Sequence, residues 1–165
     1  MAAMPSRRSA LLTAVSLAAA LAGCAREMAP SVDYVLLDGH KVSSQQWAGK
    51  VMLVNFWATS CATCVKEMPQ IVATHEKFKA RGFDTLAVAM SYDPPAFVSR
   101  FAETRKLTFG VAIDNTGAVA QAFGPVQMTP TTFLINKRGE IVKRYVGEPD
   151  FAAFHELIEK LLAEA

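Results

Sequence analysis

The alternation of apolar and polar positions divides most of the chain into strands and amphipathic helices. Residues 51–57 form an apolar run of strand length, which ends at a short polar break. From residue 61 to about residue 80, apolar side chains recur at spacings of three and four, and this spacing predicts a helix with one apolar face. Residues 83–91 form a second, nearly unbroken apolar run, which is typical of a strand that is covered on both faces of its sheet.

Weaker signals predict a small hairpin ahead of the first of these strands. The apolar runs at 34–37 and 41–42 are separated by Asp38-Gly39, and this dipeptide between apolar runs favours a tight hairpin turn. Residues 43–47 predict a short helical turn that leads toward the strand at 51–57.

The second half of the chain predicts further strands and helices. They are a helix from residue 93 to about residue 106, a short strand at 111–113, a short helix at 118–123, strands at 128–135 and 141–146, and an amphipathic helix at 151–163. The helix at 93–106 is expected to turn Phe97, Val98 and Phe101 inward, and Asp150 is expected to cap the last helix. Strands that alternate with helices and end in a hairpin and a helix predict a mixed α/β layered sheet.

Length and charge narrow the functional classes. With 165 residues, of which 52% are hydrophobic, the chain can form one domain with a proper core and has little left over for a second. Arg7 and Arg8 are the only charges in residues 1–23, so the rest of the chain carries 15 basic and 15 acidic residues. This balance argues against a nucleic-acid partner, since bulk positive charge is the usual signature of such binding.

The N-terminus has the pattern of an export signal. Arg7 and Arg8 precede an uncharged run at residues 10–22, which is too short for a comfortable transmembrane helix of roughly 20 residues. A basic start, an apolar run and small residues at its end predict a signal peptide over residues 1–23.

Residues 21–24, Leu-Ala-Gly-Cys, resemble the bacterial lipoprotein signal. The resemblance implies a lipid on Cys24, a short lipidated tether over residues 24–32 and a folded domain over residues 33–165. The alternatives are an ordinary signal peptide with a chance cysteine, or an uncleaved anchor.

The remaining cysteines, Cys61 and Cys64, open the predicted helix just after the strand at 51–57. A helix start offers unpaired N–H groups and the positive end of the macrodipole, which stabilise a thiolate. Cys61 is therefore the candidate nucleophile, and Cys64 is placed to resolve a mixed disulfide. The loop between them is too small to staple a fold, which favours a redox site over a structural disulfide. A structural zinc site would need more ligands, and His40, His75 and His155 are isolated, so no metal is expected.

Residues 57–64, Trp-Ala-Thr-Ser-Cys-Ala-Thr-Cys, resemble the active-site signature of thioredoxin-like proteins. Within that group they are most similar to membrane-anchored thiol-disulfide oxidoreductases of the TlpA/ResA type, and the resemblance runs from about residue 32 to the C-terminus. It implies a thioredoxin-like three-layer α/β sandwich with a mixed central sheet, an N-terminal hairpin and an inserted strand–helix unit at residues 83–106. It also implies a redox-active Cys61–Cys64 disulfide.

The resemblance also suggests which residues surround the cysteines. Pro130 occupies the position of a cis-proline that faces the pair, where it turns the Thr129 backbone outward to bind an extended substrate strand. A trans proline at the start of a strand is the alternative for Pro130. Trp57, at the end of its strand, would shield the pair from water and shape the contact surface, although it could equally be an ordinary core tryptophan.

Glu67 lies one helical turn beyond Cys64. In the ResA-like group a carboxylate here lies near the pair, where it can accept or relay the proton of Cys64. A solvated helix glutamate is the alternative. Asn55 stands where thioredoxin has a buried aspartate, and because an amide cannot take up a proton, the base must be Glu67 or water.

These resemblances predict an exported thiol-disulfide oxidoreductase of the bacterial periplasm or cell envelope, anchored to the membrane by lipid. Its expected partners are protein substrates with disulfides or thiols, such as apocytochrome c in cytochrome c maturation, and a membrane thiol-disulfide electron donor. We expect a monomer without a cofactor. Two alternatives stay open: a Cu(I)-binding protein that uses the thiols, with Met128 near the same face, and a peroxidase-like enzyme.

Overall fold

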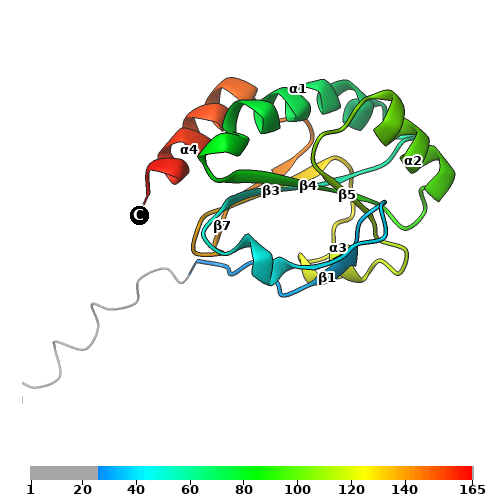
Figure 1. Cartoon of the computed structure of the whole chain (residues 1–165), viewed down its shortest axis with the longest axis horizontal. Helices are drawn as coiled ribbons and strands as arrows, with labels where there is room; N and C mark the ends of the chain where they lie inside the picture. Colours follow the sequence, from blue (N-terminus) through cyan, green and yellow to red (C-terminus); the bar gives the residue numbers. More distant parts are fainter. Residues whose placement is uncertain (1–25, 165) are drawn as a thin grey trace, which may run out of the picture.

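A five-stranded mixed sheet forms the centre of the computed structural model, which describes residues 26–164 (Figure 1). Its strand order is β5-β4-β3-β6-β7. The strands are β3 (Val51–Trp57), β4 (Phe83–Ala89), β5 (Gly110–Ile113), β6 (Thr131–Ile135) and β7 (Ile141–Val146). The first three are parallel to one another, whereas β6 is antiparallel to both of its neighbours.

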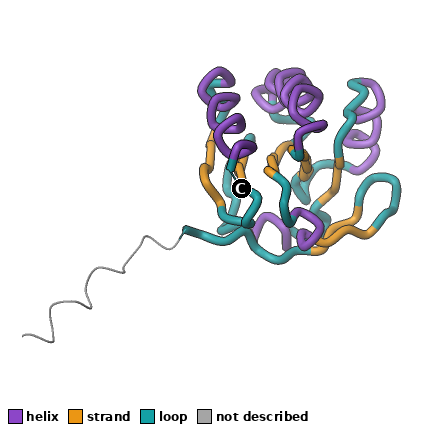
Figure 2. The backbone as a smooth tube through the Cα atoms, turned by 60° about the vertical axis from the view of Figure 1, so that its left-hand side comes forward, coloured by secondary structure: helices purple, strands orange, loops and turns teal. Residues whose placement is uncertain are grey.

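All seven residues of β3 are buried because both faces of the sheet are covered. Alternate side chains of the strand point to opposite faces, so one set packs into each of two apolar clusters. The upper layer consists of α1 (Ala62–Phe78), α2 (Pro95–Thr104) and α4 (Phe151–Ala163). The lower layer holds the hairpin of β1 (Asp33–Val35) and β2 (Lys41–Ser43), the 3-10 helix η1 (Ser44–Trp47) and α3 (Ala118–Ala122). The predicted three-layer sandwich is therefore confirmed, and Figure 2 shows its helices on either side of the strands.

Strand register decides which loops meet at one edge of the sheet. Phe56, near the end of β3, pairs with Thr131 at the start of β6, while Met52 pairs with Ile135. The segment after β3 and the segment before β6 therefore lie at the same end of the strands. We call this end, which is the carboxyl end of β3, the upper edge of β3. The turn between β6 and β7 lies at the opposite edge.

Most of the predicted elements are confirmed, within a few residues at their ends. The helix expected at 61–80 ends at Phe78 and continues as the 3-10 helix η2 (Lys79–Arg81), which Gly82 terminates with a φ of 90°. One expectation for α2 is wrong. Val98 and Phe101 face inward, but Phe97 is 61% exposed, because it lies about 100° around the helix from the buried Val98 and points away from the core.

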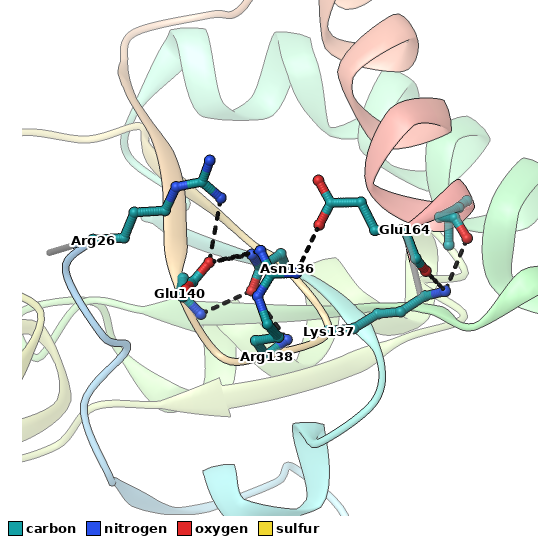
Figure 3. A network of polar contacts seen from close by, with 7 residues as sticks. Arg26, Asn136, Lys137, Arg138, Glu140 and Glu164 are labelled. Carbon is teal, nitrogen blue, oxygen red and sulfur yellow. Dashed lines mark hydrogen bonds and ion pairs between the residues drawn. The ribbon is translucent and has the colours of Figure 1, made fainter. Parts of the chain in front are cut away.

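The segment predicted as a tether lies against the domain over the part that the structure describes. The signal at 1–23 and Cys24 fall outside the described residues. The Ala29 N–H donates to the Gly139 carbonyl (2.8 Å), and the Arg26 guanidinium lies 3.3 Å from the Glu140 carboxylate (Figure 3). These bonds hold residues 26–29 beside the turn between β6 and β7, while Pro30 and Val32 are bonded to Ser44. Among residues 26–164, no helix combines the length and apolarity that crossing a membrane requires.

Asp150 caps α4 as expected, and this contact allows a stability prediction. Its carboxylate accepts hydrogen bonds from the N–H groups of Ala152 (2.9 Å) and Ala153 (3.2 Å). We expect Asp150→Ala to lower the free energy of unfolding by about 1 kcal/mol, as measured by urea denaturation. Asp150→Asn can still accept these bonds and should retain most of the stability. A loss of equal size in both variants would contradict the capping role.

Candidate active site

The two cysteines lie between the end of β3 and the first turn of α1, at the upper edge of β3. Cys61 is the N-cap of α1, and its sulfur accepts a hydrogen bond from the Cys64 N–H (3.2 Å). The two residues form a disulfide. Cys61 is partly exposed, whereas Cys64 is completely buried. An external sulfur can therefore reach Cys61 but not Cys64.

The helix start provides the electrostatics that the sequence predicted. After reduction, the Cys64 N–H and the positive end of the α1 macrodipole both face the Cys61 sulfur, and each favours its anionic form. The structure thus places Cys61 in the position of a nucleophile and Cys64 in the position of a resolving thiol.

The loop before β6 faces the disulfide from the neighbouring strand. The Thr129–Pro130 peptide bond is cis, as the resemblance implied, and the Thr129 carbonyl oxygen lies 3.5 Å from the Cys61 sulfur. Pro130 is buried, and its carbonyl accepts the Gly147 N–H (2.8 Å), which ties this loop to the end of β7. Thr129 and Pro130 therefore form one wall beside the exposed sulfur.

Glu67 is completely buried, so the alternative of a solvated helix glutamate is wrong. Its carboxylate accepts a hydrogen bond from the Asn55 side-chain amide (3.1 Å), which also donates to the Thr132 hydroxyl (2.9 Å). The pKa of Glu67 is raised to about 7, chiefly because burial disfavours its charged form. The hydrogen bond from Asn55 lowers this pKa, and the negative charge of Glu148 raises it further. Near neutral pH this carboxyl group can therefore hold or release a proton, one helical turn from Cys64.

Trp57 differs from its expected role in one respect. It is completely buried in the same cluster as Cys64, with its ring centroid 4.9 Å from that of Phe101 in α2. It can shield the cysteine pair from water, but it presents no surface to a substrate because α2 covers the end of β3.

Asp93, which was expected only to begin the helix at 93–106, also contacts the loop that carries Cys61. Its buried carboxylate accepts the Thr59 N–H (2.6 Å) and the Thr59 hydroxyl. This pair of bonds fastens the loop before α2 to the loop that carries Cys61. Only its position just after a strand, near the upper edge, could have indicated this contact.

The histidines lie apart from this site. His75 contacts the Thr85 hydroxyl, and His155 contacts that of Thr74. Among residues 26–164, no group of three or more His, Cys, Asp or Glu side chains is arranged to hold a metal ion. Met128, which the Cu(I) alternative invokes, is 63% exposed at the upper edge of β3.

Comparison with known proteins now identifies the family. The sequence model of the Redoxin family matches residues 25–158, which is most of the chain. The chain belongs to the redoxin family. This redoxin is 34% identical to the thiol-disulfide oxidoreductase ResA of Halalkalibacterium halodurans over 86% of this chain and 80% of that protein. It is 39% identical to the ResA of Geobacillus kaustophilus over 70% of this chain and 66% of that protein.

Solved structures agree with this assignment. A thiol:disulfide interchange protein of the thioredoxin family from Chlorobium tepidum superposes with a TM-score of 0.77 at 29% identity, covering 84% of this chain and 97% of that chain. A thioredoxin candidate from Neisseria meningitidis superposes with a TM-score of 0.79 at 42% identity, covering 85% of this chain and 93% of that chain. The redoxin described here is a thiol-disulfide oxidoreductase with the Cys61–Cys64 pair at its centre.

Proposed function

We propose that this redoxin reduces disulfides of exported proteins, such as apocytochrome c. The Cys61 thiolate attacks one sulfur of the substrate disulfide, a Cys61–substrate bond forms, and the other substrate sulfur leaves as a thiolate that takes up a proton. The Cys64 thiolate then attacks the Cys61 sulfur, which releases the second substrate thiol and closes the Cys61–Cys64 disulfide. Two electrons pass to the substrate. The observation that carries this proposal is the exposed Cys61 sulfur at a helix start beside the buried Cys64.

The neighbouring residues take supporting roles in this proposal. Glu67 accepts the proton that Cys64 must lose before it can attack, and its pKa of about 7 suits that exchange near neutral pH. The Thr129 backbone binds an extended stretch of substrate beside Pro130. Trp57 excludes water from beneath the sulfurs.

The proposed location is the bacterial periplasm or cell envelope, with a lipid on Cys24 and a membrane thiol carrier as the electron donor. The geometry gives this proposal an orientation. Residues 26–29 run beside the turn between β6 and β7, at the edge of the sheet opposite to Cys61. A monomer anchored through Cys24 would therefore hold its disulfide away from the membrane surface.

Trapping of substrates tests the proposal. With Cys64→Ala, a mixed disulfide at Cys61 cannot be resolved by the enzyme, so we expect exported proteins with cysteine pairs to stay covalently linked. Cells that express the variant are quenched with acid, and linked partners are identified by mass spectrometry after non-reducing separation. The matched control is Cys61→Ala combined with Cys64→Ala, which should capture nothing. Equal capture by both variants, or capture of cytoplasmic proteins alone, would contradict the proposed substrates.

A further inference from the structure

An open hollow of about 370 Å³ lies beside the active site, where α2 meets the loop that carries Cys61. It is lined by Thr59, Phe97, Arg100, Phe101, Thr104 and Arg105. Thr59 is held in place by Asp93 and stands two residues before Cys61. A molecule in this hollow would therefore lie next to the reacting sulfur.

The lining combines aromatic rings with positive charge. Phe101 packs on the buried Trp57 and is only partly exposed, whereas Phe97 is 61% exposed. Arg100 and Arg105 are both exposed, and among the described residues neither forms an ion pair. No acidic side chain lines the hollow. Two unpaired guanidinium groups beside apolar rings favour a ligand that carries carboxylates.

A second hollow lies beside the first, along the end of α2. This hollow of about 330 Å³ shares Thr104 and Arg105 with the first and runs between α1 and the end of α2, where Val65, Met68 and Val72 provide apolar lining. A small anion would occupy one hollow at most. An extended stretch of polypeptide can contact both hollows, because Thr104 and Arg105 line each of them.

Exposed apolar side chains near the cysteines also point to a protein ligand. Besides Phe97, the exposed large apolar residues include Tyr92 after β4, Met128 before Pro130 and Val146, which pairs with Thr131. All of them lie on segments at the upper edge of β3, around Cys61. Exposed apolar groups concentrated in one area mark interaction surfaces.

We infer that the hollow lined by Phe97, Arg100 and Arg105 is a specificity subsite that binds an acidic segment of the protein substrate next to its disulfide. This inference rests on the proposed reduction of protein disulfides. The arginines attract carboxylates of the substrate, while Phe97 and Phe101 receive the apolar stems. Because residues 24–165 are formally neutral, the attraction is local and not a property of the whole surface.

Reduction of matched peptides tests the subsite. Three peptides with one Cys-x-x-Cys disulfide differ only in two neighbouring positions, which are both Glu, both Gln or both Lys. The second-order rate constant for reduction by the reduced protein is measured at low and high salt. We expect the Glu peptide to react roughly 3- to 10-fold faster than the Lys peptide at low salt, with a smaller ratio at high salt.

Two double variants with the same change in charge separate the subsite from bulk charge. Arg100→Ser with Arg105→Ser should bring the three rate constants within about 2-fold of one another, with the rate for the Gln peptide unchanged. Lys143→Ser with Arg144→Ser removes two exposed charges from β7, at the far edge of the sheet from α2, and should keep the wild-type preference. Bis(2-hydroxyethyl) disulfide, which is small and uncharged, should be reduced at the same rate by all three proteins.

Each of three results would overturn the subsite. They are equal wild-type rates for the Glu and Lys peptides, equal loss of preference in both double variants, and a loss with the uncharged disulfide as large as that with the Glu peptide. Failure to reduce even the Gln peptide would instead count against the proposed function.

Discussion

Replacing Cys61 with serine is expected to lower the rate of disulfide reduction by about 1,000-fold or more, because the hydroxyl cannot act as the sulfur nucleophile. The fold should be retained. Cys61 is the N-cap of α1, and its side chain accepts the Cys64 N–H. Serine is among the best N-cap residues, so its oxygen can take over that hydrogen bond.

The measurement compares the rate constant for a disulfide peptide with the free energy of unfolding of the reduced proteins. Cys64→Ala is the matched control, because it should still attack the substrate once and then stop at the mixed disulfide. In the reduced wild type, iodoacetamide should modify Cys61 well before the buried Cys64. Reductase activity that survives in Cys61→Ser, or faster labelling of Cys64, would contradict the assignment of the nucleophile.

The features that were predicted well from the sequence are those whose residues are close together in one continuous stretch of the chain. The apolar run of β3, the break after Trp57 and the cysteines at the start of α1 lie within 14 residues, so local patterns were sufficient to place them. The hairpin turn and the N-cap at Asp150 are local for the same reason. The cis bond before Pro130 was predicted from the resemblance and not from any local rule.

The features that the sequence missed depend on contacts between distant residues. Asp93 and Thr59 are 34 positions apart, and Asn55 and Thr132 are 77 apart, so no periodicity connects them. Phe97 fits the apolar face of α2 by spacing, but of the two neighbours on the first turn only Val98 packs into the core, and Phe97 stays exposed. The spacing of apolar residues predicts which side of a helix a side chain is on, whereas its burial depends on which other elements pack against that side.

Glu67 illustrates the same limit with a larger consequence. Its place one turn after Cys64 was evident, but the choice between a solvated and a buried carboxylate required knowledge of what covers it. The packing of α1 on the sheet puts it beside Asn55 and removes it from water. Burial then brings its pKa to about 7, whereas the ordinary value is 4.5.

This pKa predicts an unusual pH dependence of stability. The folded protein holds the Glu67 proton more tightly than the unfolded chain does, so between pH 4.5 and about 7 the folded state carries more protons. The free energy of unfolding therefore falls as the pH rises through this interval, and the loss is complete about one pH unit above the folded pKa of about 7. Over this interval the free energy of unfolding is expected to fall by about 3 kcal/mol.

The variant Glu67→Gln isolates this contribution. Glutamine keeps a carbonyl oxygen for the Asn55 amide but cannot ionise, so we expect it to match the oxidised wild type near pH 4.5 and to be more stable by about 3 kcal/mol at pH 8. Urea denaturation of both oxidised proteins across this range measures the difference. Subtracting the curves cancels the histidines, since the pKa values of His75 and His155 are lowered in both proteins.

The matched control is Glu76→Gln on the exposed side of the same helix. Lys79 and Thr108 lower the pKa of Glu76 through hydrogen bonds, so its contribution to stability is present above its ordinary pKa of 4.5 and is lost as the pH falls. The two variants should therefore change stability at pH 8 in opposite directions. Parallel pH curves for the wild type and Glu67→Gln would show that the pKa of Glu67 is not raised in the folded protein. A carboxylate that is charged at neutral pH could still attract the proton of Cys64, but it would have to pass that proton on at once, and its burial would need another source of compensation.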